Sequence, residues 1–272
     1  MKVALVTGAS SGIGYETAKL LAKKDYCVYA ASRNVENMQA LRAYHVKVIQ
    51  LDLTKPNLIE SAVKHILNAE GRLDILVNNA GYGSYGAVED VTIDEARKQF
   101  EVNLFGLSEL TKAFIPSMRN QGSGKIINIS SVGGRTPNYF GSWYHASKYA
   151  LEGYSESLRL ELSDFGIDVI VIEPGGIKTN WGPITAQHLT DSSKGSIYEV
   201  KAQQMAQSMA KQDQSGLLSH PSVVAKTIIK SIESKHAKPR YVVGMAAKPI
   251  ILLHALLPIK LFNWILKKQI TN

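Results

Sequence analysis

A glycine-rich turn near the N-terminus constrains the fold of this chain more than any other feature. Residues 2–6 form an apolar run, residues 7–14 read TGASSGIG, and a helical pattern follows over 12–24. The start of a helix presents unpaired backbone N–H groups and the positive end of the helix dipole, which bind phosphate. Glycines allow the backbone to turn tightly and approach such a group. The pattern Gly-x3-Gly-x-Gly, placed between a strand and a helix, therefore predicts a nucleotide site in an α/β fold.

Short apolar runs alternate with longer helical patterns along the rest of the chain. We expect strands at 2–6, 26–31, 46–51, 75–77, 125–129, 168–172 and 240–243, and helices at 12–24, 35–43, 57–69, 93–118, 144–165 and 221–234. The runs are almost continuously apolar, as in parallel strands that are covered on both faces. No Pro/Ser-rich linker divides the chain. The sequence thus predicts one α/β domain over residues 1–272, a doubly wound parallel sheet with helices on both faces.

The composition is that of an ordinary globular protein. The chain has 272 residues, 45% of them hydrophobic, and a formal net charge of +8 that is scattered along the sequence. An anionic cofactor and ordinary surface lysines account for this charge, so we expect no nucleic-acid partner. No cluster of His, Cys, Asp and Glu has zinc-ligand spacing, and we expect no catalytic metal.

Cysteine content and the N-terminus indicate the compartment. Cys27, the single cysteine, lies in an apolar run and forms no internal disulfide, which favours a buried thiol in a reducing environment. The apolar stretch at the N-terminus is too short for a signal peptide and runs straight into the glycine turn. We therefore expect a cytoplasmic protein.

Two segments depart from the alternation. Residues 180–215 are polar and follow the sixth strand. Ligands bind beyond the carboxyl ends of parallel strands, so we expect a substrate-covering lid here, with a plain surface helix as the alternative. Residues 248–268 are apolar but lack the 18 continuous apolar residues of a membrane-spanning helix. We expect this segment to be helical and to dock against protein. The alternatives are a pocket lid and a peripheral membrane contact with Trp264 at the headgroups.

The end of the second strand indicates which cofactor binds. NAD sites place an Asp or Glu about twenty residues after the glycines, on the ribose 2′-OH. This chain has Ser32 and Arg33 there. A guanidinium can hold a 2′-phosphate by charge-assisted hydrogen bonds, whereas a carboxylate would repel it. The sequence therefore favours NADP(H), although a solvent-exposed arginine is the simpler interpretation of Arg33 taken alone.

A tyrosine and a lysine one helical turn apart could form an acid/base pair. Tyr144 and Lys148 open a strongly helical segment, and their i,i+4 spacing puts them on one face. The pKa of a free tyrosine is near 10, and a nearby ammonium group lowers it. The adjacent His145 points another way round the helix, and we do not expect it to act.

Together with the glycine turn, this pair resembles the short-chain dehydrogenase/reductase family over about residues 2–180, particularly its NADP-linked members related to steroid and retinol dehydrogenases. The family motifs have counterparts in order: a TGxxxGxG loop at 7–14, an NNAG motif at 78–81, a catalytic asparagine at Asn103, a serine at Ser131, thirteen residues before Tyr144, and a PG motif at 174–175. The resemblance implies a seven-stranded Rossmann fold.

The resemblance also implies a role for each matching residue. Tyr144 exchanges a proton with the substrate oxygen, Ser131 orients that oxygen, Lys148 lowers the tyrosine pKa and binds the nicotinamide ribose, and Asn103 holds a water. Ser131 and Tyr144 are thus the expected substrate contacts. The expected NADP(H) contacts are Gly8, Ser10, Ser11, Gly12, Ile13, Gly14, Arg33, Asp52, Leu53, Asn79, Ala80, Gly81, Tyr144, Lys148, Pro174, Gly175, Ile177 and Thr179.

The implied reaction is hydride transfer between NADP(H) and a carbonyl or alcohol. Tyr139, Phe140 and Trp143 near the predicted site favour a fairly apolar substrate, although ordinary packing explains such residues equally well. A non-catalytic NADP-binding regulator on the same fold is the alternative function. The complete set of four catalytic positions argues against it. The resemblance further implies a homodimer or homotetramer that pairs through the helices expected at 93–118 and 144–165.

Overall fold

Seven parallel strands form one sheet in the computed structural model, which describes residues 1–271 and the side chains through residue 268. The strands are β1 (Val3–Thr7), β2 (Cys27–Ser32), β3 (Lys47–Gln50), β4 (Ile75–Asn78), β5 (Gly124–Ile129), β6 (Ile167–Pro174) and β7 (Arg240–Val243). Their order in the sheet is β3-β2-β1-β4-β5-β6-β7, and each neighbouring pair is parallel. This is the strand order of a doubly wound Rossmann fold with one further strand, which confirms the predicted fold.

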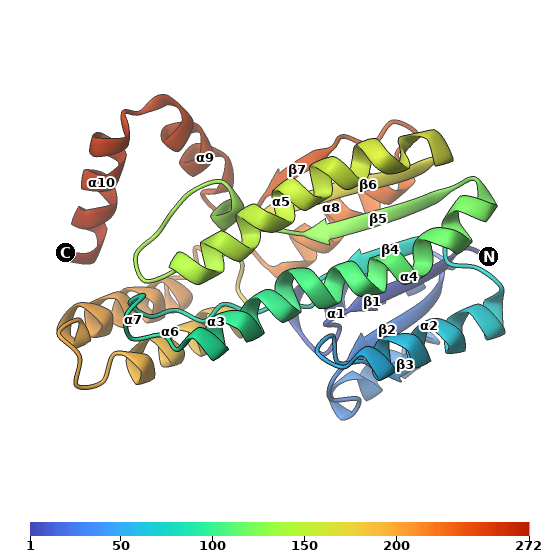
Figure 1. The fold of residues 1–272 in the computed structure, drawn as a ribbon, viewed down its shortest axis with the longest axis horizontal. Helices are drawn as coiled ribbons and strands as arrows, with labels where there is room; N and C mark the ends of the chain where they lie inside the picture. Colours follow the sequence, from blue (N-terminus) through green and yellow to red (C-terminus); the bar gives the residue numbers. More distant parts are fainter. Residues whose placement is uncertain (272) are drawn as a thin grey trace.

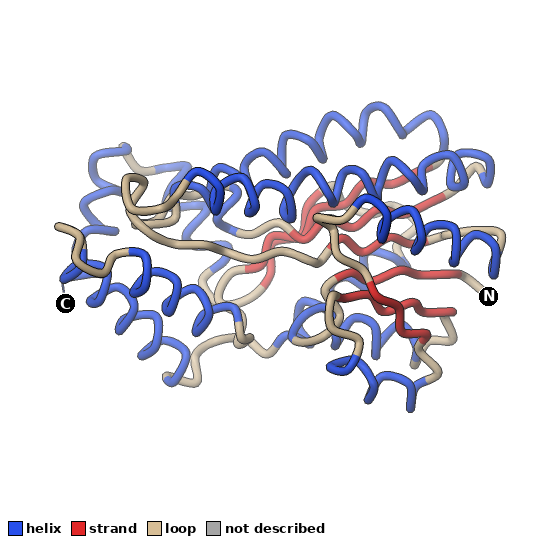
Figure 2. The backbone as a smooth tube through the Cα atoms, turned by 60° about the horizontal axis from the view of Figure 1, so that its bottom comes forward, coloured by secondary structure: helices blue, strands red, loops and turns tan. Residues whose placement is uncertain are grey.

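Helices cover both faces of the sheet, and the five inner strands are largely buried on two sides (Figures 1 and 2). On one face lie α2 (Pro56–Glu70), α4 (Gly106–Gln121) and α5 (Ser142–Leu162), and on the other α1 (Gly12–Ala22), the 3-10 helix η1 (Glu36–Tyr44) and α8 (Pro221–Glu233). Within β1, Val3 and Leu5 enter the first core, whereas Ala4 and Val6 enter the second. The continuous apolar runs in the sequence follow from these two cores.

The helix expected over 93–118 is divided into three parts. It consists of α3 (Ile93–Phe100), a π-helical turn η2 (Glu101–Phe105) and α4. The helix expected at 35–43 is present over residues 36–44 and is a 3-10 helix, and α5 begins at Ser142, two residues before the expected start at Tyr144. Hydrophobic periodicity does not report the hydrogen-bond spacing within a helix, so it misses these features.

Four additional helices lie beyond the carboxyl ends of the strands (Figure 1). The segment 180–215 forms α6 (Trp181–Ser192) and α7 (Glu199–Gln214), which pack on each other. The C-terminal segment forms α9 (Ala247–Leu256) and α10 (Ile259–Thr271). None of the helices in the described part of the chain has the length and apolar character needed to cross a membrane.

Candidate active site

The glycine turn forms a tight cradle at the start of α1. Gly8 has φ +64° and Gly12 has φ +54°, a left-handed conformation that strongly favours glycine. A Cβ on Gly14 would lie 2.5 Å from the side-chain nitrogen of Asn79 and 2.5 Å from the carbonyl oxygen of Gly8. The hydroxyl of Ser11, at the first position of the turn into α1, makes no capping hydrogen bond. The turn therefore leaves the helix start open to an anionic group.

A set of hydrogen bonds fixes this turn against the end of β4. The side-chain amide of Asn79 donates to the carbonyl oxygens of Thr7 at 2.9 Å and of Gly8 at 3.1 Å. The hydroxyl of Thr7 accepts from the backbone N–H groups of Asn79 and Ala80, each at 3.0 Å. Asn79, expected to contact the cofactor, thus has its amide engaged with the turn itself. The preceding Asn78 is buried and donates to Thr111 and Asn128.

Two predicted cofactor residues lie at the ends of β2 and β3. Arg33 is exposed directly after β2, while the buried Ser32 donates its hydroxyl proton to the carbonyl oxygen of Asn34. Asp52 is half-buried and accepts hydrogen bonds from the backbone and side chain of Thr54. Arg33 and Asp52 therefore lie at the carboxyl ends of neighbouring strands, at the same edge of the sheet as the glycine turn.

The segment after β6 returns to the glycine turn. A Cβ on Gly12 would lie 3.0 Å from the side-chain methyl group of Thr179. The backbone N–H of Gly175 donates to Val243 at 2.8 Å, and a Cβ on Gly175 would lie 2.4 Å from the carbonyl oxygen of Met245. The structure thus brings Thr179, far from the turn in sequence, against the glycine turn, and packs Gly175 of the PG motif against the segment after β7.

Asn103 lies on the π-helical turn between α3 and α4 and is fully buried. Its side-chain amide donates to the carbonyl oxygen of Tyr82 at 2.9 Å and to the hydroxyl of Ser147 at 3.0 Å, and its oxygen accepts from the backbone N–H of Tyr82 at 3.1 Å. These bonds join α5, η2 and the loop after β4. π-turns are rare and frequently occur at functional sites.

Lys148 reaches the same loop from α5. Its buried ammonium group donates to the carbonyl oxygen of Ile129 at 2.9 Å. A Cβ on Gly81 would lie 3.0 Å from the side-chain oxygen of Asn103 and 3.7 Å from the Nζ atom of Lys148. Burial lowers the pKa of Lys148 to about 8, and the negative charge of Glu152 opposes that change. Asn103 and Lys148 therefore converge on Gly81.

Tyr144 lies one helical turn before Lys148 and is 6% exposed. Burial raises the pKa of its phenol to about 12, and a hydrogen bond with the Ser131 side chain acts in the opposite direction. This net direction is opposite to the one expected from the Tyr-x3-Lys spacing. The reason is that burial disfavours the phenolate, while the Lys148 ammonium faces the Ile129 carbonyl group.

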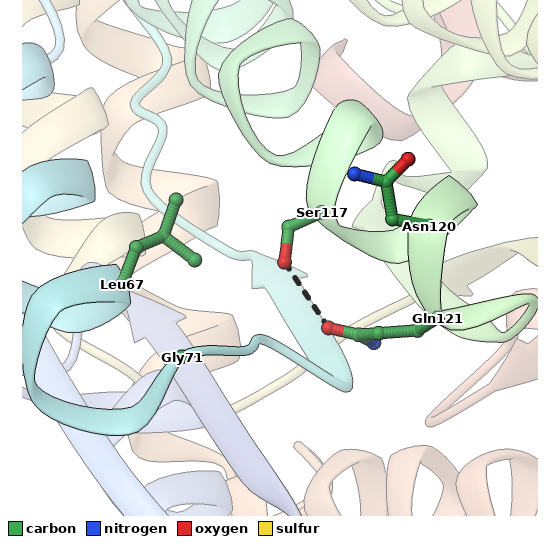
Figure 3. Close-up of a pocket in the computed structure, with 5 residues that line it drawn as sticks. All are labelled: Leu67, Gly71, Ser117, Asn120 and Gln121. Carbon is green, nitrogen blue, oxygen red and sulfur yellow. Dashed lines mark hydrogen bonds between the residues drawn. The ribbon is translucent and has the colours of Figure 1, made fainter.

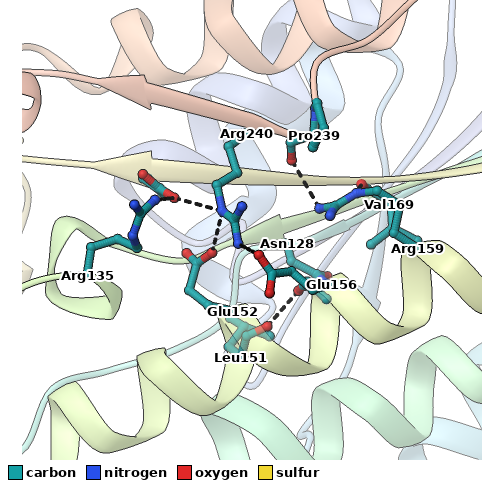
Figure 4. Close-up of polar contacts among 11 residues, drawn as sticks. Asn128, Arg135, Leu151, Glu152, Glu156, Arg159, Val169, Pro239 and Arg240 are labelled. Carbon is teal, nitrogen blue, oxygen red and sulfur yellow. Dashed lines mark hydrogen bonds and ion pairs between the residues drawn. The ribbon is translucent and has the colours of Figure 1, made fainter. Parts of the chain in front are cut away.

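An ion-pair network around Arg240, which the sequence did not predict, reaches Glu152, one helical turn after Lys148 on α5 (Figure 4). The guanidinium of Arg240 on β7 bonds to Glu152 on α5 at 3.0 Å and to Glu173 on β6 at 3.3 Å, and it also pairs with Glu156. Arg135 contacts the same oxygen of Glu173 at 3.3 Å. Glu152, which influences the Lys148 ammonium, is thus held in place by a β7 residue. The i,i+4 spacing of Lys148 and Glu152 was the only signal in the sequence.

An aromatic and apolar cluster covers Tyr144. Its ring centroid lies 5.3 Å from Trp181 on α6 and 5.7 Å from Tyr85. Leu189 of α6 and Met205 of α7 belong to the same buried cluster, as do Phe140 and, at its margin, Tyr139. Trp143 packs elsewhere, against Phe100. Of the three aromatic residues singled out in the sequence, Tyr139 and Phe140 therefore belong to the cluster that contains Tyr144.

Hydrogen bonds attach α6 to the loop after β4. The hydroxyl of Thr185 donates to the carbonyl oxygen of Gly83 at 3.3 Å, and that of Ser192 donates to Tyr85 at 3.3 Å. The Trp181 ring lies so close to Gly83 that a Cβ there would be 2.6 Å from it. The segment 180–215 thus packs directly over the Tyr144 region.

His145 has a structural position. Its ring is buried and its Nδ1 atom lies 2.9 Å from the carbonyl oxygen of Gly133. Burial lowers the pKa of the imidazole. The residue therefore joins α5 to the loop that carries Ser131.

A groove between the carboxyl ends of α2 and α4 lies at the opposite edge of the sheet (Figure 3). It is lined by Leu67, Gly71, Ser117, Asn120 and Gln121. The side chain of Gln121 bonds to the backbone of Leu73 and to Ser117, so the polar groups there stabilise the turn before β4. The groove carries no titratable side chain and lies away from Tyr144.

Comparisons with known proteins agree with this geometry. Residues 2–189 match the short chain dehydrogenase family. A probable short-chain type dehydrogenase/reductase, VdlC of Helicobacter pylori, is 37% identical over 94% of this chain and 93% of its own. A 3-ketodihydrosphingosine reductase of Bacteroides thetaiotaomicron is 36% identical over 89% of this chain and 88% of its own.

Solved structures give the same result. A short-chain dehydrogenase from Streptomyces avermitilis has a TM-score of 0.79 at 33% identity and covers 93% of this chain and 92% of its own. An actinorhodin polyketide ketoreductase with NADPH has a TM-score of 0.71 at 32% identity, covering 85% and 90%. The fold is that of a Rossmann-type oxidoreductase. The chain belongs to the short-chain dehydrogenase/reductase family.

Proposed function

We propose that this protein is an NADP(H)-dependent oxidoreductase that interconverts a carbonyl compound and an alcohol, with Tyr144 as the proton donor and acceptor. One observation carries the proposal. Tyr144 is buried beside Ser131. One helical turn later, Lys148 lies with Asn103 next to Gly81. Gly81 follows β4, and Asn79 at the end of that strand is hydrogen-bonded to the glycine turn.

The residues around the glycine turn fit a dinucleotide with a 2′-phosphate. The open start of α1 would hold the pyrophosphate, and the absence of a Cβ at Gly14 keeps the turn tight. Arg33 would bind the 2′-phosphate, because it is exposed after β2 and both positions at the end of that strand lack a carboxylate. Asp52 would lie beside the adenine, and Lys148 would bind the nicotinamide ribose. Among relatives, the ketoreductase structure contains NADPH.

The nicotinamide, when bound, supplies or accepts the hydride. At neutral pH the phenol of Tyr144 keeps its proton, since burial raises its pKa, and it can donate that proton to the oxygen of a carbonyl group under reduction. The hydroxyl of Ser131 would hold the same oxygen. In the reverse direction the phenolate form of Tyr144, which is populated at higher pH, accepts the proton of an alcohol.

The proposed substrate is a fairly apolar carbonyl compound. Trp181 and Tyr85 pack on the ring of Tyr144, Met205 belongs to the same buried cluster, and α6 and α7 would act as a lid over it. The name of the 3-ketodihydrosphingosine reductase indicates that this relative acts on a keto compound.

Two measurements on the purified protein test the proposal. NADPH binding is followed by fluorescence, and NADPH oxidation is followed with a panel of aldehydes and ketones of increasing apolar surface. We expect binding and turnover together, with apolar carbonyls favoured. Binding of NADPH with no turnover on any carbonyl, or on any alcohol with NADP⁺, would indicate a regulator and contradict the proposal.

A further inference from the structure

The two C-terminal helices form an arm that leaves the body at the carboxyl end of the sheet (Figure 1). The arm is defined here as residues 247–271. Its inward side packs on the protein, since Phe262 is 2% exposed and Leu266 is also buried. The ring of His254 on α9 meets Phe262 edge-on at 4.8 Å, which joins the two helices. On this side, residues of the 248–268 segment are packed against protein.

The outward face of α10 is apolar and exposed. Trp264 is 51% exposed and Leu261 is 43% exposed, and Leu256 at the end of α9 is 72% exposed. On α10, Leu261 and Trp264 are three residues apart and share a face, and helical geometry places that face opposite Phe262. Exposed leucines and a tryptophan gathered on two adjoining helices form a patch of the kind that marks an interaction surface.

The charge of the arm indicates whether a second copy of the chain or a lipid surface covers the apolar face. Residues 247–271 contain four lysines, Lys248, Lys260, Lys267 and Lys268, and no Asp or Glu. The Lys268 ammonium lies 4.2 Å from the ring centroid of Trp264, at the border of the apolar face. Two copies of this face would bring lysines against lysines with no carboxylate between them. An anionic lipid surface instead accepts both the apolar side chains and the lysines.

We propose that the arm docks this protein on an anionic phospholipid surface as a peripheral, interfacial contact. Apolar residues of the outward face would enter the boundary between headgroups and acyl chains, while the lysines remain at the phosphates. Because α10 packs against α7, docking would bring the segment that covers Tyr144 close to the lipid surface. The proposal goes beyond the proposed reaction and does not depend on it.

Vesicle sedimentation with the full chain tests this directly. The probes are phosphatidylcholine vesicles with and without phosphatidylglycerol, and the test variant is Leu256→Ser combined with Trp264→Ser. Both positions are exposed, so folding is preserved, as circular dichroism would verify. Leu160→Ser is the matched control, because Leu160 is equally apolar and 78% exposed in α5, outside the arm.

We expect the wild type and Leu160→Ser to sediment with the anionic vesicles, more weakly without phosphatidylglycerol or in high salt. Removal of two inserted side chains should lower the partition coefficient about a hundredfold, at roughly tenfold for each. Absence of wild-type binding to the anionic vesicles, or equal binding by the double variant, would overturn the proposal. Light scattering without lipid gives a further test. If the double variant had a smaller mass than the wild type, a second copy of the chain would cover the apolar face, and the proposal would also be overturned.

Discussion

The ammonium group of Lys148 donates a hydrogen bond to the backbone carbonyl oxygen of Ile129 at 2.9 Å. This bond anchors α5 to the end of β5 and directs the positive charge toward the edge of the sheet, where Asn103 and Gly81 also lie. Tyr144 is thereby left in an apolar environment with Ser131 as its polar partner. Tyr144 and Lys148 lie one helical turn apart on α5, as the sequence predicts, but burial determines the direction of both pKa changes.

The buried Lys148 should make stability depend on pH. Burial lowers its pKa from 10.5 to about 8, so between these values the unfolded chain binds more protons than the folded one, and stability rises with pH. Below pH 8 the ammonium is charged in both states and the pH dependence from this group vanishes. At 1.36 kcal/mol per pH unit, the rise is at most about 3 kcal/mol.

The variant Lys148→Met isolates this contribution. Urea unfolding of both proteins between pH 8 and pH 10.5 should show the wild type gaining stability relative to the variant as pH rises. Parallel dependence of the two free energies of unfolding on pH would show that Lys148 is not buried as described.

Ser131 should determine how readily Tyr144 ionises. Its hydrogen bond lowers the pKa of the phenol, so Ser131→Ala should move the pH profile of alcohol oxidation to higher pH and reduce turnover. Ser130→Ala is the matched control, because the adjacent Ser130 hydroxyl is buried and makes no hydrogen bond within the described residues. Steady-state rates over a pH series check this, and an equal effect of both substitutions would remove Ser131 from the mechanism.

Much of the fold could be predicted from the sequence because the sheet has two cores. Val3 and Ala4 point to opposite faces and both are buried, so the strands appear as continuous apolar runs. The hydrogen-bond pattern within helices could not be predicted. The π-turn at Asn103 depends on bonds to Tyr82 and Ser147, which lie on other elements.

The sequence outlines the candidate site where its residues fall close together in the chain, as in 7–14 and 144–148. Contacts that depend on the tertiary fold were missed. Arg240 pairs with Glu152 and Glu173, which lie on two other elements, and only the completed sheet places β7 beside β6. The exposure of Trp264 is also set by which side of α10 packs on the body.

Cofactor preference should depend on Arg33. A charge-assisted contact to the 2′-phosphate contributes roughly 1.5–3 kcal/mol, so Arg33→Ala should weaken NADPH binding about ten- to a hundredfold and leave NADH binding nearly unchanged. Arg42→Ala, an exposed arginine on η1, is the control. Calorimetric titration of both cofactors provides the measurement. Equal losses for NADPH and NADH on Arg33→Ala would refute the assignment.

The protein should form a homodimer or homotetramer through α4 and α5. Phe105, the last residue of η2 directly before α4, is 56% exposed, and Tyr149 on α5 is also exposed, which leaves apolar surface for a partner. Light scattering at micromolar concentration should give at least twice the mass of the chain, and Phe105→Glu should lower it. A monomer at that concentration would exclude this assembly.

Turnover and NADPH affinity of Tyr144→Phe test the central claim most directly. The substitution removes only the phenolic oxygen, so the ring still packs on Trp181 and Tyr85. General acid/base catalysis contributes about 10²–10⁴-fold. We therefore expect turnover to fall by at least about a hundredfold with NADPH affinity nearly unchanged, whereas Tyr149→Phe, at an exposed position of the same helix, keeps full activity. If Tyr144→Phe kept more than about a tenth of wild-type turnover, Tyr144 would not be the acid/base.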